Sequence, residues 1–266
     1  VSALLYLLAP YHILNLYVRG NVAEFTAMTV LPWLLFFTQR LVLGRGRDVV
    51  NRWGTALSAA ALILTHNLTA FFGGLFVALW CALWFFGRRQ SFPLVSVIQA
   101  GTAGVLISAF FWLPMLAEMK YTRFEVMDHT FRAAPAHTVA WRQYFSRDWG
   151  FGDSVPGTDD RMSFAIGWTQ WLGVAGTLSM LAWRREWSSR ARVALFMTLS
   201  LFLLLFLMSW VAAPLWKLPV LSAIQFPWRL LAIASLCAAV TASYGVEALR
   251  ERWPRAGLAA AGALVA

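Results

Sequence analysis

Apolar runs of about twenty residues recur along the whole chain, and short connectors rich in arginine separate them. A helix needs about 20 apolar residues to cross the roughly 30 Å hydrocarbon core of a bilayer. The pattern therefore predicts an all-α, polytopic membrane protein. The hydrophobic share of 60% supports this, because soluble domains contain roughly 45–50%. The predicted spans lie near 1–10, 23–40, 54–66, 68–87, 94–117, 165–183, 193–211, 229–249 and 257–266.

These runs give about seven complete spans and two truncated ones, which we treat as one transmembrane domain over 1–266. The chain begins on "VSALLYLLAP" and stops inside "GLAAAGALVA", so we expect a fragment of a longer protein. The connector 118–164 is long, and loops beyond about 15 residues tend to carry function or structure of their own. Its segment "TVAWRQYFSRDWGFG" is typical of a helix that lies in the membrane interface.

The segment 53–87 is too long for one span. A single helix over it would measure about 50 Å, far more than the bilayer core. Its two flanks, "GRGRDVVNR" and "GRR", are both basic, and one span would place them on opposite sides. A helical hairpin that turns at His66 and Asn67 resolves both problems. Its first arm, 54–66, would be short, so we expect the turn to lie in a recess below the membrane surface.

Basic residues divide unequally between the two sides of this topology. One side receives thirteen arginines against four acidic residues, and the other receives nine basic and eight acidic residues. Cytoplasmic loops carry an excess of Lys and Arg, so we expect the first side to be cytoplasmic and loop 118–164 to lie outside. The net charge of +10 is then a signal of orientation and argues against a nucleic-acid partner. The thirteen are Arg40, Arg45, Arg47, Arg52, Arg88, Arg89, Arg184, Arg185, Arg190, Arg192, Arg250, Arg252 and Arg255.

Four polar motifs interrupt the apolar pattern, and this topology places all four on the outer face. They are "YHILNLYVRGNVAE", the "THN" of the hairpin turn, loop 118–164 and "KLPVLSAIQFPWR". Their convergence on one face predicts a functional site there.

The first motif carries Arg19 and Glu24 near a helix start. A carboxylate in the first turn is favoured by the helix dipole but must be paired or hydrated, and an ion pair with Arg19 would satisfy both groups. As substrate-binding candidates we take Arg19 with His12 and Tyr17. The alternative is that Arg19 reaches the lipid headgroups and that Tyr11, His12 and Tyr17 are ordinary interface residues.

The hairpin turn and the last motif each add candidates with an alternative reading. His66 and Asn67 are candidate substrate-binding residues, or they cap the turn, since such side chains satisfy freed backbone groups. In "QFPWR", Pro227 is suited to a helix start. Arg229 then lies near backbone amides that favour a phosphate, with Gln225 beside it. The alternative is a helix start with an interfacial tryptophan and a headgroup contact from Arg229.

The long loop contains "GDSVPGTDDRMSF", with Asp159 and Asp160 adjacent. Paired aspartates could hold a divalent cation or act as a base, and the alternative is a solvated turn before a helix. No motif typical of a tightly bound metal or cofactor occurs, and Cys81 and Cys237 lie in separate apolar runs.

Together, "APYHILNLYVRGNVAEFTAMTVLPWLLF", "LTHNLTA", "GDSVPGTDDRMSFAIGWTQWLG" and "IQFPWRLL" resemble the bacterial membrane-protein family labelled "6-pyruvoyl-tetrahydropterin synthase-related". The resemblance covers nearly the whole chain and implies the bacterial cytoplasmic (inner) membrane as its location. A pterin synthase is a soluble enzyme with a histidine-bound zinc. We expect no such activity, because His12, His66, His129 and His137 are dispersed without ligand spacing.

The resemblance further implies an architecture similar to the GT-C glycosyltransferases, which take a sugar from a polyprenyl-phosphate carrier on the outer face. Transfer needs a carboxylate base and cations that stabilise the departing phosphate. Arg19 and Arg229 suit the cationic role. The main aspartate of such enzymes usually lies in the first outer loop, which we expect to precede this fragment, and Glu24, Asp159 and Asp160 are the substitutes. The other function class is a non-enzymatic membrane protein, either a lipid or polymer carrier or an envelope-complex scaffold.

Overall fold

The computed structural model describes residues 1–87, 91–121, 134–184, 188–218 and 221–265. The chain divides into two compact units. Unit 1 comprises Val1–Gly20 and Met127–Ala266, and unit 2 comprises Asn21–Val126.

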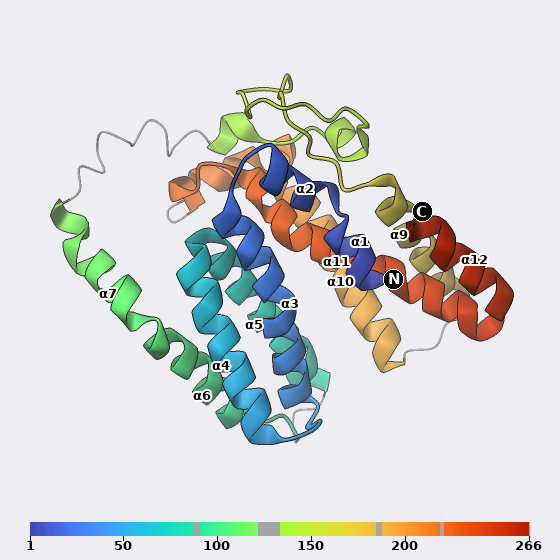
Figure 1. The fold of residues 1–266 in the computed structure, drawn as a ribbon, viewed down its shortest axis with the longest axis horizontal. Helices are drawn as coiled ribbons and strands as arrows, with labels where there is room; N and C mark the ends of the chain where they lie inside the picture. Colours follow the sequence, from blue (N-terminus) through green and yellow to red (C-terminus); the bar gives the residue numbers. More distant parts are fainter. Residues whose placement is uncertain (88–90, 122–133, 185–187, 219–220, 266) are drawn as a thin grey trace. The chain divides into compact units, whose positions relative to one another are not determined.

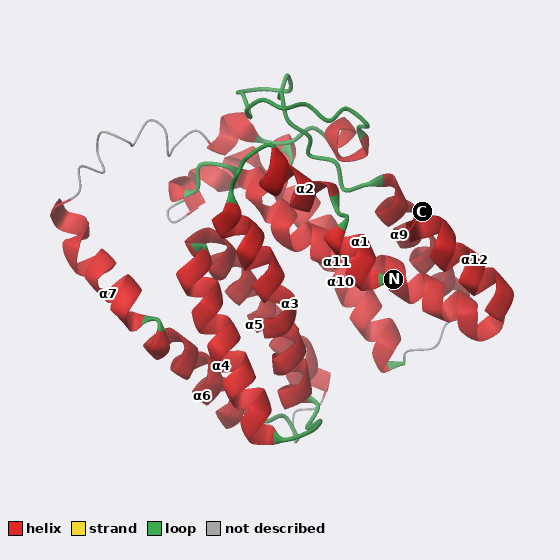
Figure 2. Ribbon diagram, in the orientation of Figure 1, coloured by secondary structure: helices red, strands yellow, loops and turns green. Residues whose placement is uncertain are grey.

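The described residues are mostly helical and contain no β-strand, apart from one isolated bridge between Val139 and Ser209 (Figure 2). The predicted all-α membrane fold is confirmed. Among the described helices, four are long and apolar enough to cross a membrane. These are Val22–Val42, Asn67–Gly87, Ser189–Met208 and the combined stretch Pro227–Arg252. A fifth arises if Leu94–Ile107 and Ala109–Tyr121, bent by 63°, form one span, so the larger predicted number of spans stays a prediction.

Unit 2 is a bundle of α-helices that follow one another along the chain (Figure 1). They are α3 (Val22–Val42), α4 (Asp48–Thr65), α5 (Asn67–Gly87), α6 (Leu94–Ile107) and α7 (Ala109–Glu118), with the 3-10 turn η1 (Met119–Tyr121). Helices α4 and α6 approach closely at Gly104, where a side chain would clash with the backbone oxygen of Ala56. Small residues at such contacts let membrane helices pack backbone to backbone.

The predicted hairpin is confirmed, because α4 ends at Thr65 and α5 begins at Asn67. Its first arm is longer than the sequence predicted. Helix α4 has 18 residues and measures about 27 Å, since Asp48 to Trp53 continue the helix. The expectation of a turn recessed by a short arm was therefore based on a wrong helix boundary.

Unit 1 is built around α11 (Leu231–Arg252), which is buried along most of its length. It packs against α9 (Trp168–Arg184), α10 (Ser189–Met208), α12 (Pro254–Val265) and α1 (Ser2–Leu7). Gly245 lets α11 lie against α9, where its amide donates to the hydroxyl of Thr177 at 3.0 Å. The ion pair Arg190–Glu251, at 2.9 Å, joins the start of α10 to the end of α11.

The remainder of unit 1 lies at the other end of these helices. Its described residues contain α2 (Pro10–Tyr17) and five short 3-10 helices. They are η2 (Ala134–His137), η3 (Trp141–Phe145), η4 (Trp210–Lys217), η5 (Leu221–Ala223) and η6 (Pro227–Leu230). The predicted interfacial segment contains η3, and an interfacial position for it stays a prediction. Tyr144 anchors η3, since its buried hydroxyl donates to the carbonyl of Leu205 at the end of α10, at 2.9 Å.

Candidate functional site

Two arginines from opposite ends of the sequence meet on one indole in unit 1. Trp228 is 3% exposed and lies in η6. The guanidinium carbon of Arg19 lies 4.6 Å from its ring centroid, and that of Arg229 lies 6.0 Å from it. Both distances are in the range of cation–π contacts. The structure therefore brings together two of the predicted phosphate-binding residues, about two hundred positions apart.

Helix α2 positions Arg19 through residues one and two turns before it. Tyr11 and Asn15, four positions apart, share one face of α2, and Arg19 follows two residues after the helix ends at Tyr17. The guanidinium donates to the Tyr11 hydroxyl at 3.1 Å and to the side-chain oxygen of Asn15. The Tyr11 ring also contacts Trp228 edge to face, at 6.5 Å between centroids. The side chain of Arg19 is thus held at a defined place beside the indole.

Aromatic rings surround Trp228 on its other sides. Phe226 stacks on it at 5.0 Å, and Phe164 from the long loop lies 5.7 Å away. The guanidinium of Arg229 also lies 5.4 Å from the Phe226 ring. We name Tyr11, Arg19, Phe226, Trp228 and Arg229 the arginine–aromatic cluster.

Ser154 and His137 tie this cluster to the long loop. The indole nitrogen of Trp228 donates to the Ser154 hydroxyl at 3.2 Å, and the same oxygen lies 3.0 Å from Nδ1 of His137. The His137 ring packs edge to face on Phe226 at 4.9 Å. Burial lowers the pKa of His137, and the nearby carboxylate of Asp160 opposes that shift. Sequence reasoning missed both residues. Ser154 lies in the motif "GDSVPGTDDRMSF", in which only the aspartates had a predicted role, and His137 shows no ligand spacing with the other histidines.

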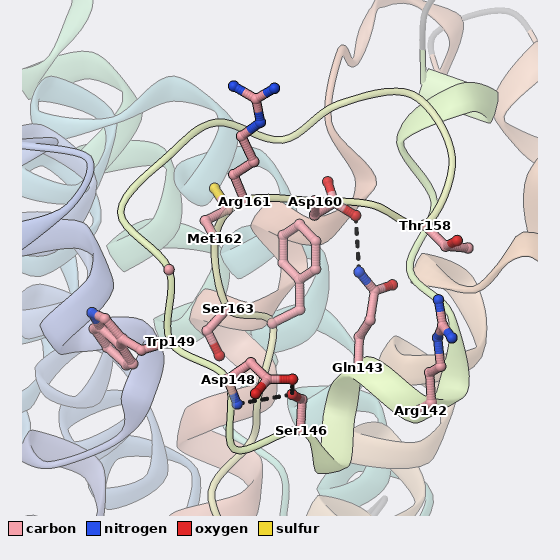
Figure 3. Close-up of a pocket in the computed structure, with 12 residues that line it drawn as sticks. Arg142, Gln143, Ser146, Asp148, Trp149, Thr158, Asp160, Arg161, Met162 and Ser163 are labelled. Carbon is pink, nitrogen blue, oxygen red and sulfur yellow. Dashed lines mark hydrogen bonds between the residues drawn. The ribbon is translucent and has the colours of Figure 1, made fainter.

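A pocket of about 480 Å³ opens in the long loop beside the cluster (Figure 3). Small-molecule sites commonly enclose about 300–1,000 Å³. Phe164 lines the pocket and also contacts Trp228, so the pocket and the cluster share a wall. The pocket is also lined by Arg142, Gln143, Ser146, Asp148, Trp149, Asp160 and Arg161.

Hydrogen bonds and glycines fix the frame of this pocket. Two stretches of the loop pair where Gly152 N donates to Arg161 O at 2.8 Å and Arg161 N donates to Asp153 O at 3.0 Å. Gly150 has φ +70°, and a side chain there would collide with the carbonyl of Arg161. A residue other than glycine would be strained at such a φ. The close approach of the two stretches therefore depends on glycine.

The family model described as "6-pyruvoyl-tetrahydropterin synthase related domain; membrane protein" matches residues 1–266. The chain belongs to this family. The resemblance seen in the sequence motifs is confirmed, and so is the membrane character. A search of curated proteins and a search of solved structures returned no match. The GT-C-like architecture stays a prediction for this member of the family.

The acidic candidates of the long loop have different surroundings. Asp159 is exposed. Asp160 accepts hydrogen bonds on both oxygens, from Gln143 Nε2 at 2.9 Å and from the amide of Val155 at 3.1 Å. Among the described residues, no group of three or more His, Cys, Asp or Glu side chains could hold a metal ion. The hypothesis of a divalent cation at Asp159 and Asp160 gains no support from this arrangement.

The candidates of unit 2 serve helix starts. Nδ1 of His66 accepts the Thr69 amide at 3.2 Å and lies 2.8 Å from the Thr69 hydroxyl, so the imidazole caps α5. Exposed Asn67 contacts the sulfur of Met115 at 3.9 Å. Glu24 is fully buried, and Asn21 both accepts its amide and donates to its carboxylate. Arg19 belongs to unit 1 and Glu24 to unit 2, and their pairing stays a prediction.

Three further candidates lie in unit 1. His12 is buried and packs edge to face on Tyr6, at 4.4 Å between ring centroids. Tyr17 is 73% exposed. Gln225 is half-buried and directly precedes Phe226 of the cluster. A role in substrate binding stays a prediction for all three.

Proposed function

We propose that this membrane protein is a glycosyltransferase-like protein that binds a polyprenyl-phosphate-linked sugar at the outer face of the membrane. Arg19 and Arg229 are the groups that hold the phosphate. One observation carries the proposal: both guanidiniums lie against the buried indole of Trp228.

The chemistry of arginine explains why this arrangement suits a lipid phosphate. Guanidinium is planar and can donate two parallel hydrogen bonds to phosphate oxygens. Contacts of Arg19 with Tyr11 and Trp228 limit its rotamers, so less freedom is lost when an anion binds.

A lipid carrier without transferase activity is the second candidate, and the state of Asp160 favours it. Both oxygens of this carboxylate are occupied by hydrogen bonds within the loop. These bonds give Asp160 a structural role in holding the loop, whereas a general base must have an oxygen within hydrogen-bond reach of the acceptor proton. Phosphate binding is common to both candidates, and sugar transfer separates them.

Binding of undecaprenyl phosphate to the full-length protein in lipid nanodiscs tests the common step. Arg229→Lys removes the planar fork but keeps the charge, and we expect binding about tenfold weaker, equivalent to about 1.4 kcal/mol. Arg40→Lys in unit 2 is the matched control, since Arg40 also makes a cation–π contact, with Phe36 at 5.3 Å. Equal weakening by both substitutions contradicts the proposed phosphate site.

Sugar transfer from a polyprenyl-phosphate-linked hexose is then measured on the same preparation. Sugar release that requires Arg229 supports the transferase. Tight binding without release assigns the protein to the carrier class.

The outer-face part of the proposal is tested by labelling single cysteines in intact cells. A cysteine at Asp153 should react with a membrane-impermeant maleimide, and one at Arg47 should react only after permeabilisation, because of the charge asymmetry of the loops. Labelling of both from one side contradicts the orientation. Since Cys81 and Cys237 are native, they are first replaced by serine.

A further inference from the structure

We propose that the pocket of the long loop is a saccharide-binding subsite for one or two sugar rings. The inference rests on the proposed function in one respect: the saccharide is the one carried by the lipid phosphate at Arg19 and Arg229. Its own support comes from the lining and frame of the pocket.

The rim of the pocket supplies hydrogen-bond donors. Arg142 on η3 and Arg161 on the facing stretch of the loop both line the pocket (Figure 3). Both side chains are exposed. Within the described parts of the chain, neither guanidinium makes a hydrogen bond or an ion pair. Each therefore has its full set of donors available to a ligand.

The walls supply acceptors that are already fixed in place. Gln143 donates to Asp160 and accepts the amide of Ala140, so both side chains are held by the loop. The Ser146 hydroxyl donates to one oxygen of Asp148, which leaves the other oxygen as an acceptor. Sugar hydroxyls both donate and accept, and a lining of guanidinium, carboxylate and hydroxyl groups matches them.

Apolar surface lies among these polar groups. Buried Phe164 and half-buried Trp149 also line the pocket. A sugar ring has apolar C–H faces as well as hydroxyls, and an aromatic ring packs against such a face. A purely hydrocarbon ligand would instead leave the arginines and aspartates without hydrogen bonds in the filled pocket, which is costly.

The position of the pocket connects it to the phosphate site. Phe164 lines the pocket, and its ring centroid lies 5.7 Å from that of Trp228. The guanidinium carbon of Arg19 lies 4.6 Å from the centroid of the same indole. All of these residues belong to unit 1. A ligand with a phosphate and an attached sugar fits two adjoining compartments, one cationic and one of mixed polarity.

The subsite is tested without lipid, by saturation-transfer NMR on the full-length protein in nanodiscs. The probes are maltose, which is neutral, and a disaccharide of glucuronic acid, which is anionic. We expect at least one probe to bind, and the double variant Arg142→Ala/Arg161→Ala to weaken its affinity about tenfold or more. Failure of both probes to bind the native protein overturns the proposal.

Arg147→Ala is the matched control, because Arg147 is an exposed arginine of the same loop that does not line the pocket. It should leave the affinity for the probe unchanged. Equal losses in Arg147→Ala and in the double variant overturn the subsite. A melting temperature within a few degrees of the native protein shows that each variant is folded.

The two proposals fail in different ways. If the subsite exists, Arg229→Lys weakens binding of undecaprenyl phosphate but leaves saccharide binding intact. Saccharide binding without any phosphate binding supports the subsite and overturns the proposed function. Phosphate binding without saccharide binding overturns the subsite alone.

Discussion

The two units use the same kinds of polar residue in different ways. In unit 2, His66 caps α5, Asn21 caps α3, and buried Asn51 donates to the carbonyl of Arg45 while accepting from Arg40. In unit 1, the guanidiniums of Arg19 and Arg229 both lie within cation–π distance of the Trp228 ring. These polar groups of unit 2 serve partners within 11 positions of the sequence, at or near helix ends.

The contacts of unit 1 join distant parts of the chain. Trp228 meets Arg19 from the first helices and Ser154 from the long loop. Capping a helix end does not need such partners, and bringing them together has an entropic cost. Residue type alone therefore does not identify a candidate site in this protein. The long-range contacts around the ring of Trp228 do identify one.

The largest effect is expected from removing that ring. Trp228→Ala takes away a side chain that is 3% exposed and that contacts both arginines. We expect a loss of about 3–5 kcal/mol in the free energy of unfolding, together with loss of undecaprenyl phosphate binding. Equilibrium unfolding in mixed micelles and nanodisc binding assays measure the two effects.

Trp210→Ala is the control for that substitution. Trp210 also lies in unit 1 but is 62% exposed, so its replacement should change the unfolding free energy by no more than about 0.5 kcal/mol. Similar losses of unfolding free energy in the two variants would contradict the central role of Trp228 in unit 1.

A smaller effect is expected at the link between cluster and loop. Ser154→Ala leaves the buried indole N–H of Trp228 without its acceptor, which costs about 1–3 kcal/mol. We expect weaker phosphate binding as well, because the ring that supports both arginines is less well held. Ser179→Ala, at an exposed serine of α9, should change neither quantity. Unchanged phosphate affinity in Ser154→Ala would show that this hydrogen bond from the long loop does not support phosphate binding at the cluster.

His66 tests the other half of the comparison. His66→Ala removes the cap of α5 and should cost about 1 kcal/mol in the free energy of unfolding, whereas His66→Asn should restore most of it, since asparagine is a good N-cap. Phosphate binding should stay the same in both variants. A loss of phosphate affinity in the asparagine variant would show that His66 contributes to phosphate binding.

The fold could be predicted from the sequence much further than the site. Long apolar runs and basic connectors identified α3, α5 and α10, and their bounds differ from the predicted spans by a few residues. The start of α4 was missed because Asp48 and Arg52 interrupt the apolar pattern. In the helix they pair with each other one turn apart.

The site was predicted only in part. Basic residues near helix starts pointed to Arg19 and Arg229, but nothing in the sequence indicates that both contact the ring of Trp228. The link from Ser154 to His137 spans 17 positions without a repeating pattern. Such contacts depend on how the loop folds back over η6, and this folding cannot be predicted from the local sequence.

The smallest effect is expected from pH. The folded protein holds His137 with a lowered pKa because the ring is partly buried. Below the unfolded value of about 6.5, the unfolded chain takes up a proton more readily than the folded one. The free energy of unfolding should therefore fall slightly as pH decreases from 7 to 5, and His137→Gln should make this slope shallower. An equal or steeper slope in the variant would contradict the assigned environment of His137.

The central claim is that unit 1 holds the lipid phosphate at the arginine–aromatic cluster. Photo-crosslinking tests it most directly, with a polyprenyl phosphate that carries a diazirine on the isoprene unit next to the phosphate, followed by peptide mapping of the full-length protein in nanodiscs. The account predicts that crosslinks concentrate in 11–19 and 226–230, and that excess unlabelled polyprenyl phosphate suppresses them. Crosslinks confined to unit 2, or spread evenly over the apolar helices and insensitive to competitor, would contradict it.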